Sequence, residues 1–456
     1  MKNSIALTTV LFSIVFLSCK DNNTLVSTKQ LRVNAPFEMP AIRIPDFDGC
    51  KKFPITKYGA VQGDKERTGI AIAKAIDEAD KTGGGIVVIP EGEWLTGKIH
   101  LKSNVNLHLD NGAVLLFSDD PADYLPAVKT TWEGMECYNY SPLIYAYGCK
   151  NVAVTGQGEL IAKMDIWQTW FSRPPAHMNS LKRLYTLAAK SCPVEERQMV
   201  NDSSHLRPQF IQFNRCESVL LEGITIANSP FWVIHPYMSR EIVVRNVKVM
   251  AHGHNNDGID PEMSQNMLIE NCIFDQGDDA IAVKSGRNQD AWRLNIPTRN
   301  LVIKDCTVKN GHQLLAIGSE LSGGIENVYM DSCQVVDGAK LNHLVFIKTN
   351  ERRGGYVRNI YVSNIESGRI AEGIIGIDTD VSYQWRNLVP TYERKLTPVL
   401  DVYLYNIHAT NVKFISRITG QKELPVKNIY LTDVNADTLR TEKFINENVT
   451  GFVYKE

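Results

Sequence analysis

The sequence predicts an all-β protein, a single-domain, right-handed parallel β-helix with a capping helix at its N-terminal end. The first observation is a repeat: segments such as "REIVVRNVKV" and "RNLVIKDCTV" alternate apolar and polar residues and recur every 23 to 42 residues. The second is that no long amphipathic helix separates the copies. A short strand that returns at this spacing can bury its apolar face by stacking on its neighbours, about 4.8 Å apart, so equivalent positions form columns.

The first 19 residues are the predicted leader of an exported protein. Lys2 precedes an apolar run over 5–17 that is too short to span a bilayer of about 30 Å as a helix. The run ends in Leu-Ser-Cys, which is similar to the cleavage box of bacterial lipoproteins, so Cys19 is the expected lipid attachment site. An ordinary cleaved signal peptide is the alternative. We expect residues 20–45 to be a tether and the protein to be lipid-anchored to the bacterial envelope, with no other membrane contact.

The segment 68–85 predicts the capping helix. It carries apolar residues at helical spacing, and three glycines end it. These apolar residues are Ile72, Ala75, Ile76 and Ala79. A helix in this place covers the apolar end and the unpaired strand edge of the first coil. The following stretch, 83–120, supplies the first coils of a β-helix domain that we expect over residues 46–456.

One interior column supports the stacking. The position six residues after the anchor of each repeat reads Ile224, Val247, Cys272, Cys306, Cys333, Ile365, Ile407 and Val434. Cysteines replace Val and Ile one for one, so we interpret them as small buried hydrophobic residues. No cysteine spacing suggests a zinc site, and a disulfide such as Cys137 with Cys149 stays open.

Five aspartates lie between residues 257 and 279, and the β-helix brings some of them together. Asp257 and Asp279 are 22 residues apart, about one short coil, so we expect them on neighbouring coils of one face. A bend at the glycine before Asp278 would turn two adjacent side chains toward the same groove. His312 and Lys348 follow at intervals of 34 and 36 residues, similar to the longer coils.

Such a column of carboxylates suits glycoside hydrolysis, which needs one carboxyl as proton donor and another as base for water. Mutual repulsion should raise the pKa of one carboxyl and leave it protonated. The alternative is that aspartates at these turns make turn hydrogen bonds or bind a structural cation. We prefer that alternative for Asp260 and Asp275, which have a turn context and no expected stacked partner.

Four motifs resemble those of glycoside hydrolase family 28, the polygalacturonases and rhamnogalacturonan hydrolases. The family's order is Asn-Thr-Asp-Gly, Gly/Gln-Asp-Asp, Gly-His-Gly and Arg-Ile-Lys. Here the motifs read Asn255-Asn256-Asp257-Gly258, Gly277-Asp278-Asp279, Gly311-His312-Gln313 and Phe346-Ile347-Lys348. The likeness extends from about residue 53 to the C-terminus. It implies a pectate-lyase-like solenoid and an inverting hydrolase that cleaves α-galacturonosyl linkages of pectin.

The resemblance implies a role for each matching residue. Asp278 is the expected general acid, and Asp257 and Asp279 are expected to hold and activate the water. His312 would sustain the protonation of Asp278; a structural histidine is the alternative. The candidate substrate-binding residues are Asn255, Lys348, Phe346, Lys284, Arg287 and His235. Of these, Lys348, Lys284 and Arg287, like Arg293, could instead be solvated surface cations, and the neighbouring Trp232 could equally be a core residue or a sugar platform.

Two departures from the family motifs bear on the substrate. Gln313 replaces a Gly, and Phe346 stands where polygalacturonases have an Arg that binds the leaving-group galacturonate. A Phe cannot pair with a carboxylate but suits the methyl group of rhamnose. We therefore expect an exo-acting galacturonidase of rhamnogalacturonan oligosaccharides. The alternatives are that Phe346 is a core residue with Arg352 or Arg353 taking the charge role, and an exo- or endo-polygalacturonase of homogalacturonan.

The expectation of exo action rests on a long insertion over 167–205, aromatic and partly helical in pattern, which could close one end of the groove. The formal net charge of −2, from 49 Lys and Arg against 51 Asp and Glu, gives no reason to expect nucleic acid. No cofactor or metal is expected, and the protein is predicted to be a monomer. A non-catalytic polysaccharide-binding β-helix and a calcium-dependent β-helix lyase are the rival functions.

Overall fold

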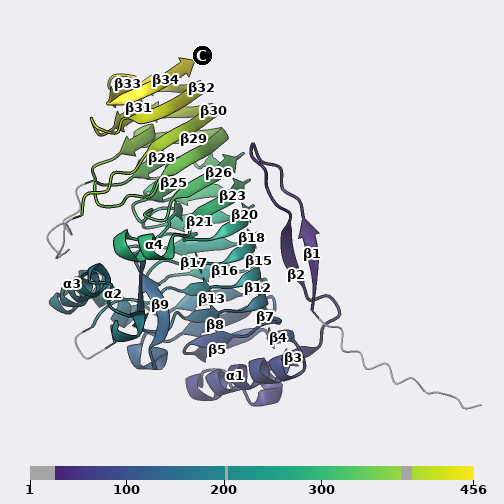
Figure 1. Cartoon of the computed structure of the whole chain (residues 1–456). Coiled ribbons are helices and arrows are strands. Elements are labelled where there is room, and N and C mark those ends of the chain that lie inside the picture. Colours follow the sequence, from purple (N-terminus) through teal and green to yellow (C-terminus); the bar gives the residue numbers. More distant parts are fainter. Residues whose placement is uncertain (1–25, 201–203, 382–392) are drawn as a thin grey trace, which may run out of the picture.

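The computed structural model describes residues 26–200, 204–381 and 393–456, and most of them form one elongated stack of β-coils (Figure 1). The leader, with the expected lipid site Cys19, lies outside the described residues. Among those residues, no helix is long and apolar enough to cross a membrane. The predicted fold class, an all-β parallel β-helix with a capping helix, is confirmed.

Each coil contributes a strand to two or three parallel sheets. The first sheet contains β3 (Lys52–Pro54), β4 (Gly85–Ile89), β7 (Val105–Leu109), β12 (Lys150–Gly156), β15 (Glu217–Glu222), β18 (Arg240–Arg245), β20 (Gln265–Glu270), β23 (Thr298–Lys304), β26 (Ile325–Asp331), β29 (Val357–Asp378), β30 (Val399–Val412), β32 (Val426–Leu439) and β34 (Val449–Lys455). The second contains β5 (Gly92–Thr96), β8 (Ala113–Phe117), β13 (Glu159–Ala162), β16 (Thr225–Ala227), β19 (Lys248–Ala251), β21 (Ile273–Gln276), β24 (Thr307–Asn310) and β27 (Gln334–Val335).

The third sheet, which we call the groove sheet, positions the candidate site. It contains β6 (Ile99–Leu101), β11 (Ile144–Tyr147), β14 (Ile211–Asn214), β17 (Ile234–Tyr237), β22 (Ile281–Val283), β25 (Gln313–Gly318), β28 (Leu341–Lys348), β31 (Phe414–Thr419) and β33 (Phe444–Glu447), and the end of the long β29 pairs between β28 and β31. Single bridges at Ile259 and Glu262 join β17 to β22, so the ladder continues through the aspartate-rich bend.

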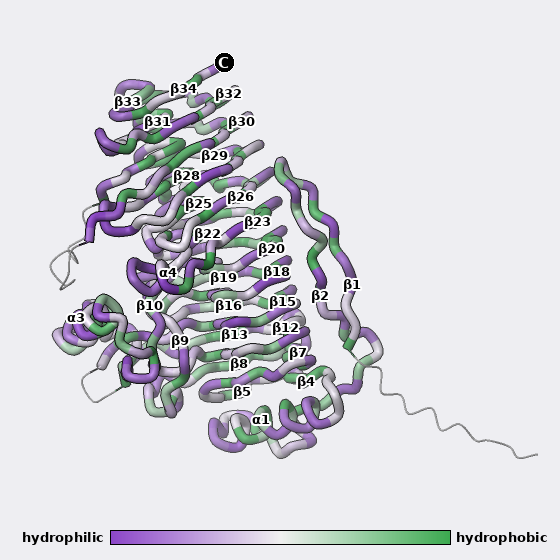
Figure 2. Tube along the Cα trace, viewed as in Figure 1, coloured by the Kyte–Doolittle hydropathy of each residue, from purple (hydrophilic) through white to green (hydrophobic). Residues whose placement is uncertain are grey.

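The interior of the coils is the apolar column predicted from the repeat. All eight members from Ile224 to Val434 are at most 2% exposed, and Figure 2 shows apolar and polar residues alternating along the stacked strands. Cys272, Cys306 and Cys333 lie in this column with free, buried thiols. Cys137, on β10, and Cys149, between β11 and β12, are also free and buried. The interpretation of the column cysteines as small hydrophobic residues is therefore confirmed.

Helix α1 (Lys65–Lys81) covers the first coil, at the bottom of the stack in Figure 1. The carboxylate of Asp64 caps it by accepting a hydrogen bond from the main-chain nitrogen of Arg67 at 3.0 Å. Its apolar face is fully buried against the first strands, and all four predicted positions are among the buried residues. A 3-10 turn, η1 (Ile55–Tyr58), leads into it. This cap confirms the helix predicted over 68–85.

The tether expected over residues 20–45 is wrong for its described part. Strands β1 (Ser27–Leu31) and β2 (Ile42–Asp46) form an antiparallel hairpin that runs beside the first sheet (Figure 1). Ile42 and Ile44 pack on an unusual apolar outer face of that sheet, made by Ala153, Leu220, Val243, Leu268 and Val302. Because the strands of this sheet carry apolar residues on both faces, the N-terminal segment is needed to bury the outer one.

A lateral subdomain lies beside the groove sheet. It consists of the antiparallel pair β9 (Val128–Trp132) and β10 (Met135–Asn139) and of the helices α2 (Asp165–Trp170), α3 (Pro175–Ala189) and α4 (Asn288–Leu294), with the short turns η2 (Pro121–Tyr124) and η3 (Val194–Glu196). The helices α2 and α3 belong to the predicted insertion. Trp132, Leu181, Leu184 and Phe231 join a separate small core that fixes the subdomain to the β-helix.

Candidate active site

Stacking of coils brings Asp257 and Asp279 together, as the 22-residue spacing predicted. The main-chain nitrogen of Gly258 donates to the carbonyl of Asp279 at 3.0 Å, and Ile259 bridges Ile281 two positions later. The two aspartates therefore occupy equivalent positions on neighbouring coils. Both are buried, at 3% and 1% exposure, yet both line a cavity above the groove sheet.

Asp278 faces the same cavity as Asp279 although the two residues are adjacent. The chain bends at Gly277, where a β-carbon would lie 2.6 Å from the main-chain nitrogen of Gly253. Only glycine permits this close approach of two coils. The main-chain nitrogen of Asp279 also donates to Asp278 Oδ1 at 2.9 Å, which fixes the bend. The predicted turn toward the groove is thus produced by a tight backbone contact.

The cavity has a volume of about 510 Å³ and a strongly charged lining. It is lined by Glu133, Arg173, Trp232, His254, Asn255, Asp257, Asp278, Asp279, Lys284, Arg287, His312, Ser319, Glu320 and Lys348. All three motif aspartates, His312 and Lys348 are in this set. The size and polarity suit a single charged sugar unit better than an apolar ligand.

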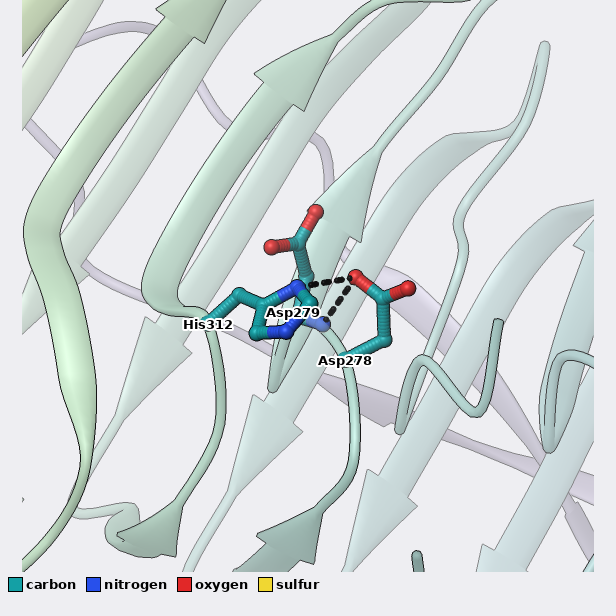
Figure 3. A group of neighbouring side chains, drawn as sticks. All are labelled: Asp278, Asp279 and His312. Carbon is teal, nitrogen blue, oxygen red and sulfur yellow. Dashed lines mark hydrogen bonds and ion pairs between the residues drawn. The ribbon is translucent and has the colours of Figure 1, made fainter. Parts of the chain in front are cut away.

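His312 and Lys348 each contact one aspartate of the adjacent pair. His312 Nδ1 lies 2.9 Å from Asp278 Oδ1, while its ring is about half exposed (Figure 3). Lys348, at the end of β28, donates from Nζ to Asp279 Oδ2 at 2.8 Å. Gln313, the residue that departs from the family's glycine, turns its amide nitrogen toward Asp279 Oδ1 and the carbonyl of His312. Both oxygens of Asp279 are therefore held by hydrogen-bond donors.

The same trio has the donor set of a possible cation site. One oxygen each from Asp278 and Asp279 and a ring nitrogen of His312 lie within 4.8 Å of one another. These groups fit a small divalent ion by type. However, they are already paired with each other and with Lys348, and acid–base hydrolysis of a glycoside requires no metal.

Lys284 and Arg287 are buried and line the cavity, which excludes the alternative that they are solvated surface cations. Lys284 is 3% exposed and its Nζ lies 3.3 Å from Asp257 Oδ2 and 3.3 Å from Glu320 Oε2. Arg287 pairs with Glu133 at 3.1 Å and with Glu320. Their charges are therefore committed to protein carboxylates, and Lys284 holds Asp257 in place.

A family model that describes the glycosyl hydrolases of family 28 matches residues 194–453. The matched region contains all four motifs, the groove sheet from β14 onward and the charged cavity floor. This chain belongs to glycosyl hydrolase family 28. It is therefore a glycoside hydrolase, and the non-catalytic binding module considered from the sequence is set aside.

Solved structures and curated proteins with family 28 activities resemble the chain over most of its length. An exopolygalacturonase from Thermotoga maritima is 36% identical, with a TM-score of 0.80 over 90% of this chain and 93% of that one. A probable polygalacturonase from Vitis vinifera is 29% identical over 83% of this chain and 73% of its own length. An exo-poly-alpha-D-galacturonosidase from Dickeya chrysanthemi is 28% identical, but the match spans only 62% of this chain and 50% of that protein.

The protonation of this family 28 site differs from the simplest expectation. Burial alone would raise the pKa of Asp278, but the hydrogen bond and the charge of His312 outweigh it, and the pKa falls to about 2. The same hydrogen bond raises the pKa of His312. Burial and the charge of Asp278 raise the pKa of Asp257 to about 7. In the free enzyme, the proton between Asp278 and His312 therefore resides on His312, which is positioned to pass it to Asp278.

Two predicted substrate-binding residues do not line the cavity. His235 is fully buried, with Nε2 3.0 Å from Glu262 Oε2 and Nδ1 accepting a hydrogen bond from Gln212. The prediction that His235 contacts the substrate directly is therefore wrong. Phe346 is half-buried and stacks on His343, with ring centroids 4.6 Å apart, just outside the cavity. Asn255 is in place: it lines the cavity and its Oδ1 accepts from Arg207 at 3.0 Å.

The structure also decides between several alternatives. Trp232 is 2% exposed but lines the cavity, and the ammonium of Lys284 lies 4.6 Å from its ring centroid. Arg293 is half-exposed, pairs with Glu136 and lies outside the cavity lining. Arg353 is buried and donates to the carbonyl of Ser319, so it does not take over the charge role proposed for it.

Sequence reasoning did not identify Glu133, Arg173, His254 and Glu320 as cavity residues. Arg173 could have been predicted as a cavity residue, because it lies in the insertion expected to close the groove. His254 directly precedes the first motif; its Nε2 is buried without a hydrogen-bond partner among the described residues, and burial lowers its pKa to about 4. It is therefore a neutral imidazole beside the site. Glu133 and Glu320 carried no signal in the sequence, because long-range packing alone brings them to the cavity.

Proposed function

We propose that this enzyme is an exo-acting, inverting galacturonidase that releases single galacturonate units from the non-reducing ends of pectic oligosaccharides. The proposal combines the family 28 site with the shape of its surroundings. The relatives include two whose names state exo action on galacturonans. The sugar on the leaving-group side is argued separately below.

The observation that carries exo action is a wall across one side of the cavity. Glu133, at the turn between β9 and β10, contacts Arg287 with its carboxylate, and the main-chain nitrogen of Arg287 donates to the carbonyl of Gly134 at 3.0 Å. Arg173 of the insertion lines the same side. A polymer that runs along the groove sheet from the C-terminal coils would stop at this wall, so only a chain end can reach the aspartates.

The chemistry follows from the paired groups. Asp278 would protonate the glycosidic oxygen, with His312 returning a proton to it, while water held between Asp257 and Asp279 attacks the anomeric carbon from the opposite side. Lys348 holds the carboxylate of Asp279 in place through its 2.8 Å contact. Since no protein carboxylate is proposed to form a covalent intermediate, the product should first appear with inverted configuration.

For the leaving-group sugar we favour rhamnose, and hence rhamnogalacturonan oligosaccharides. The support is Phe346, two residues before Lys348 on β28, which offers an apolar ring beside the cavity where the family's polygalacturonases have arginine. Homogalacturonan is the second candidate, and the 36% identity to an exopolygalacturonase favours it. The two differ in one measurable respect, the identity of the sugar next to the released galacturonate.

The test is product analysis with oligogalacturonides and rhamnogalacturonan oligosaccharides that carry a non-reducing galacturonate. Wild type should release only monomeric galacturonate, and Asp278→Asn should lower kcat by about 10²-fold or more because it removes the acid. Larger products would contradict exo action. Release from oligogalacturonides alone would replace the rhamnose proposal with the homogalacturonan one. As a specificity variant, Phe346→Arg should impair cleavage next to rhamnose; equal improvement on both substrates would contradict the role of Phe346.

A further inference from the structure

Asp260, three residues after Asp257, is fully buried behind the cavity. Its turn context in the sequence favours turn hydrogen bonds or a structural cation. Instead, Lys284 Nζ lies 3.5 Å from Asp260 Oδ1, in addition to its contacts at 3.3 Å with Asp257 Oδ2 and with Glu320 Oε2. One ammonium group therefore faces three carboxyl groups in the protein interior.

The surrounding charges do not balance this cluster. Arg287 contacts Glu320 but is shared with Glu133. His235 of the preceding coil contacts Glu262 of the coil that carries Asp260, and Lys348, two coils beyond Asp279, is engaged by Asp279. The excess of negative charge thus falls on Asp257 and Asp260. Isolated charges of this kind are expensive to bury, and a carboxyl group in such a place takes up a proton.

The hydrogen-bond pattern shows where that proton is needed. Asp257 Oδ1 and both oxygens of Asp260 are buried and accept no hydrogen bond from any described residue. Buried acceptors without a donor are energetically unfavourable. A proton on Asp260 converts one of these acceptors into a donor for another, which no rotation of two ionised carboxylates can do.

We propose that Asp260 is a positioning residue that stays protonated and donates a hydrogen bond to Asp257, so that Asp257 is held as an oriented carboxylate toward the reacting water. This inference rests on the proposed role of Asp257 in activating water. Burial and the charge of Asp257 raise the pKa of Asp260 well above its usual range, in agreement with the geometry. A carboxylic acid kept neutral by its surroundings is a known means of providing a donor inside an active site.

The test compares the pH dependence of kcat/KM in Asp260→Leu and Asp260→Asn. Leucine removes the donor, which destabilises the Asp257 carboxylate, so the acidic limb should move to higher pH by about one unit and kcat should fall. Asparagine keeps a neutral donor and should restore the limb to within a few tenths of a unit of wild type. If Asp260 were ionised, Asp260→Asn would remove a negative charge, and the limb would move to lower pH; that result would overturn the proposal.

A second measurement is independent of turnover. The infrared difference spectrum between wild type and Asp260→Asn, recorded near pH 8, should contain the carbonyl band of a protonated carboxylic acid. A carboxylate band in its place would overturn the inference even if the enzyme were active. If the acid band is present but neither pectic substrate is cleaved, the proposed function fails and the protonation of Asp260 stands.

Discussion

At the scale of single residues, the three aspartates of the site are chemically alike but pair with different partners. Asp278 is tied to a histidine, Asp279 to a lysine, and Asp257 to a buried lysine. Asp278 and Asp257 therefore titrate differently although they line one cavity. The motif spacing predicted that the aspartates would meet. It could not predict that Lys284 and Arg287 are buried, because the carboxylates that neutralise them, such as Glu133 and Glu320, come from distant coils.

These pairings predict a bell-shaped pH dependence. The pKa of Asp257 is raised, so activity is lost as the pH falls through a value well above the ordinary aspartate range. The hydrogen bond to Asp278 raises the pKa of His312 above its ordinary value, so activity is lost as the pH rises through that higher pKa. Profiles of kcat/KM should show both limbs, and His312→Gln should abolish the basic limb. An unchanged basic limb in that variant would assign the limb to another group.

At the scale of strands, the anchor position of each repeat is occupied by a residue whose backbone has the left-handed conformation. All eight anchor residues from Ser218 to Asn428 have φ between 56° and 60°, a conformation that Asn tolerates better than most side chains. Asn266, Asn300, Asn327 and Asn359 are also linked side chain to side chain at 2.9–3.0 Å. The anchor position requires a left-handed backbone conformation, so the same few residue types recur there. This recurrence made the repeat visible in the sequence and allowed its strands to be placed.

The ladder predicts a graded loss of stability at Asn327, which donates to Asn300 and accepts from Asn359 at 3.0 Å. Asn327→Ala should lower the free energy of unfolding by about 2–4 kcal/mol, because it removes two hydrogen bonds and puts in the left-handed region a residue that tolerates it less well than Asn. Asn327→Gly removes the same hydrogen bonds, but glycine adopts the left-handed conformation without strain. The stability lost in this variant should therefore be about half of that lost in Asn327→Ala. Denaturant unfolding checks both; equal losses would exclude the contribution of backbone conformation.

At the scale of the whole molecule, the β-helix is closed by different elements on different sides. Helix α1 seals the first coil, the β1–β2 hairpin covers the outer face of the first sheet, and the lateral subdomain stands beside the groove. The cap was predictable because its helical pattern is strong. The hairpin was not, because β1 reads "STKQL", with one apolar residue, and pairs antiparallel in a region that resembles a linker.

Removal of the hairpin tests its covering role. A chain that begins at residue 47, and so lacks the hairpin, should expose Leu220, Val243 and Leu268. It should self-associate in light scattering and bind an apolar dye, because a contiguous apolar patch of this kind promotes association. Val243→Thr and Leu268→Thr in the shortened chain should reduce both effects. A shortened chain that stays monomeric and dye-free would show that the outer face does not need the hairpin.

The wall beside Glu133 has a consequence for the order of events after cleavage. If the enzyme acts on chain ends as proposed, the released monosaccharide lies at the blind end, and the shortened polymer still fills the way out. The polymer must leave before the monosaccharide can follow, so every turnover ends with complete departure of the chain. Such an enzyme works distributively: it trims many chain ends by one unit each and does not travel along any of them, and free galacturonate that re-enters the blind end competes with the next chain.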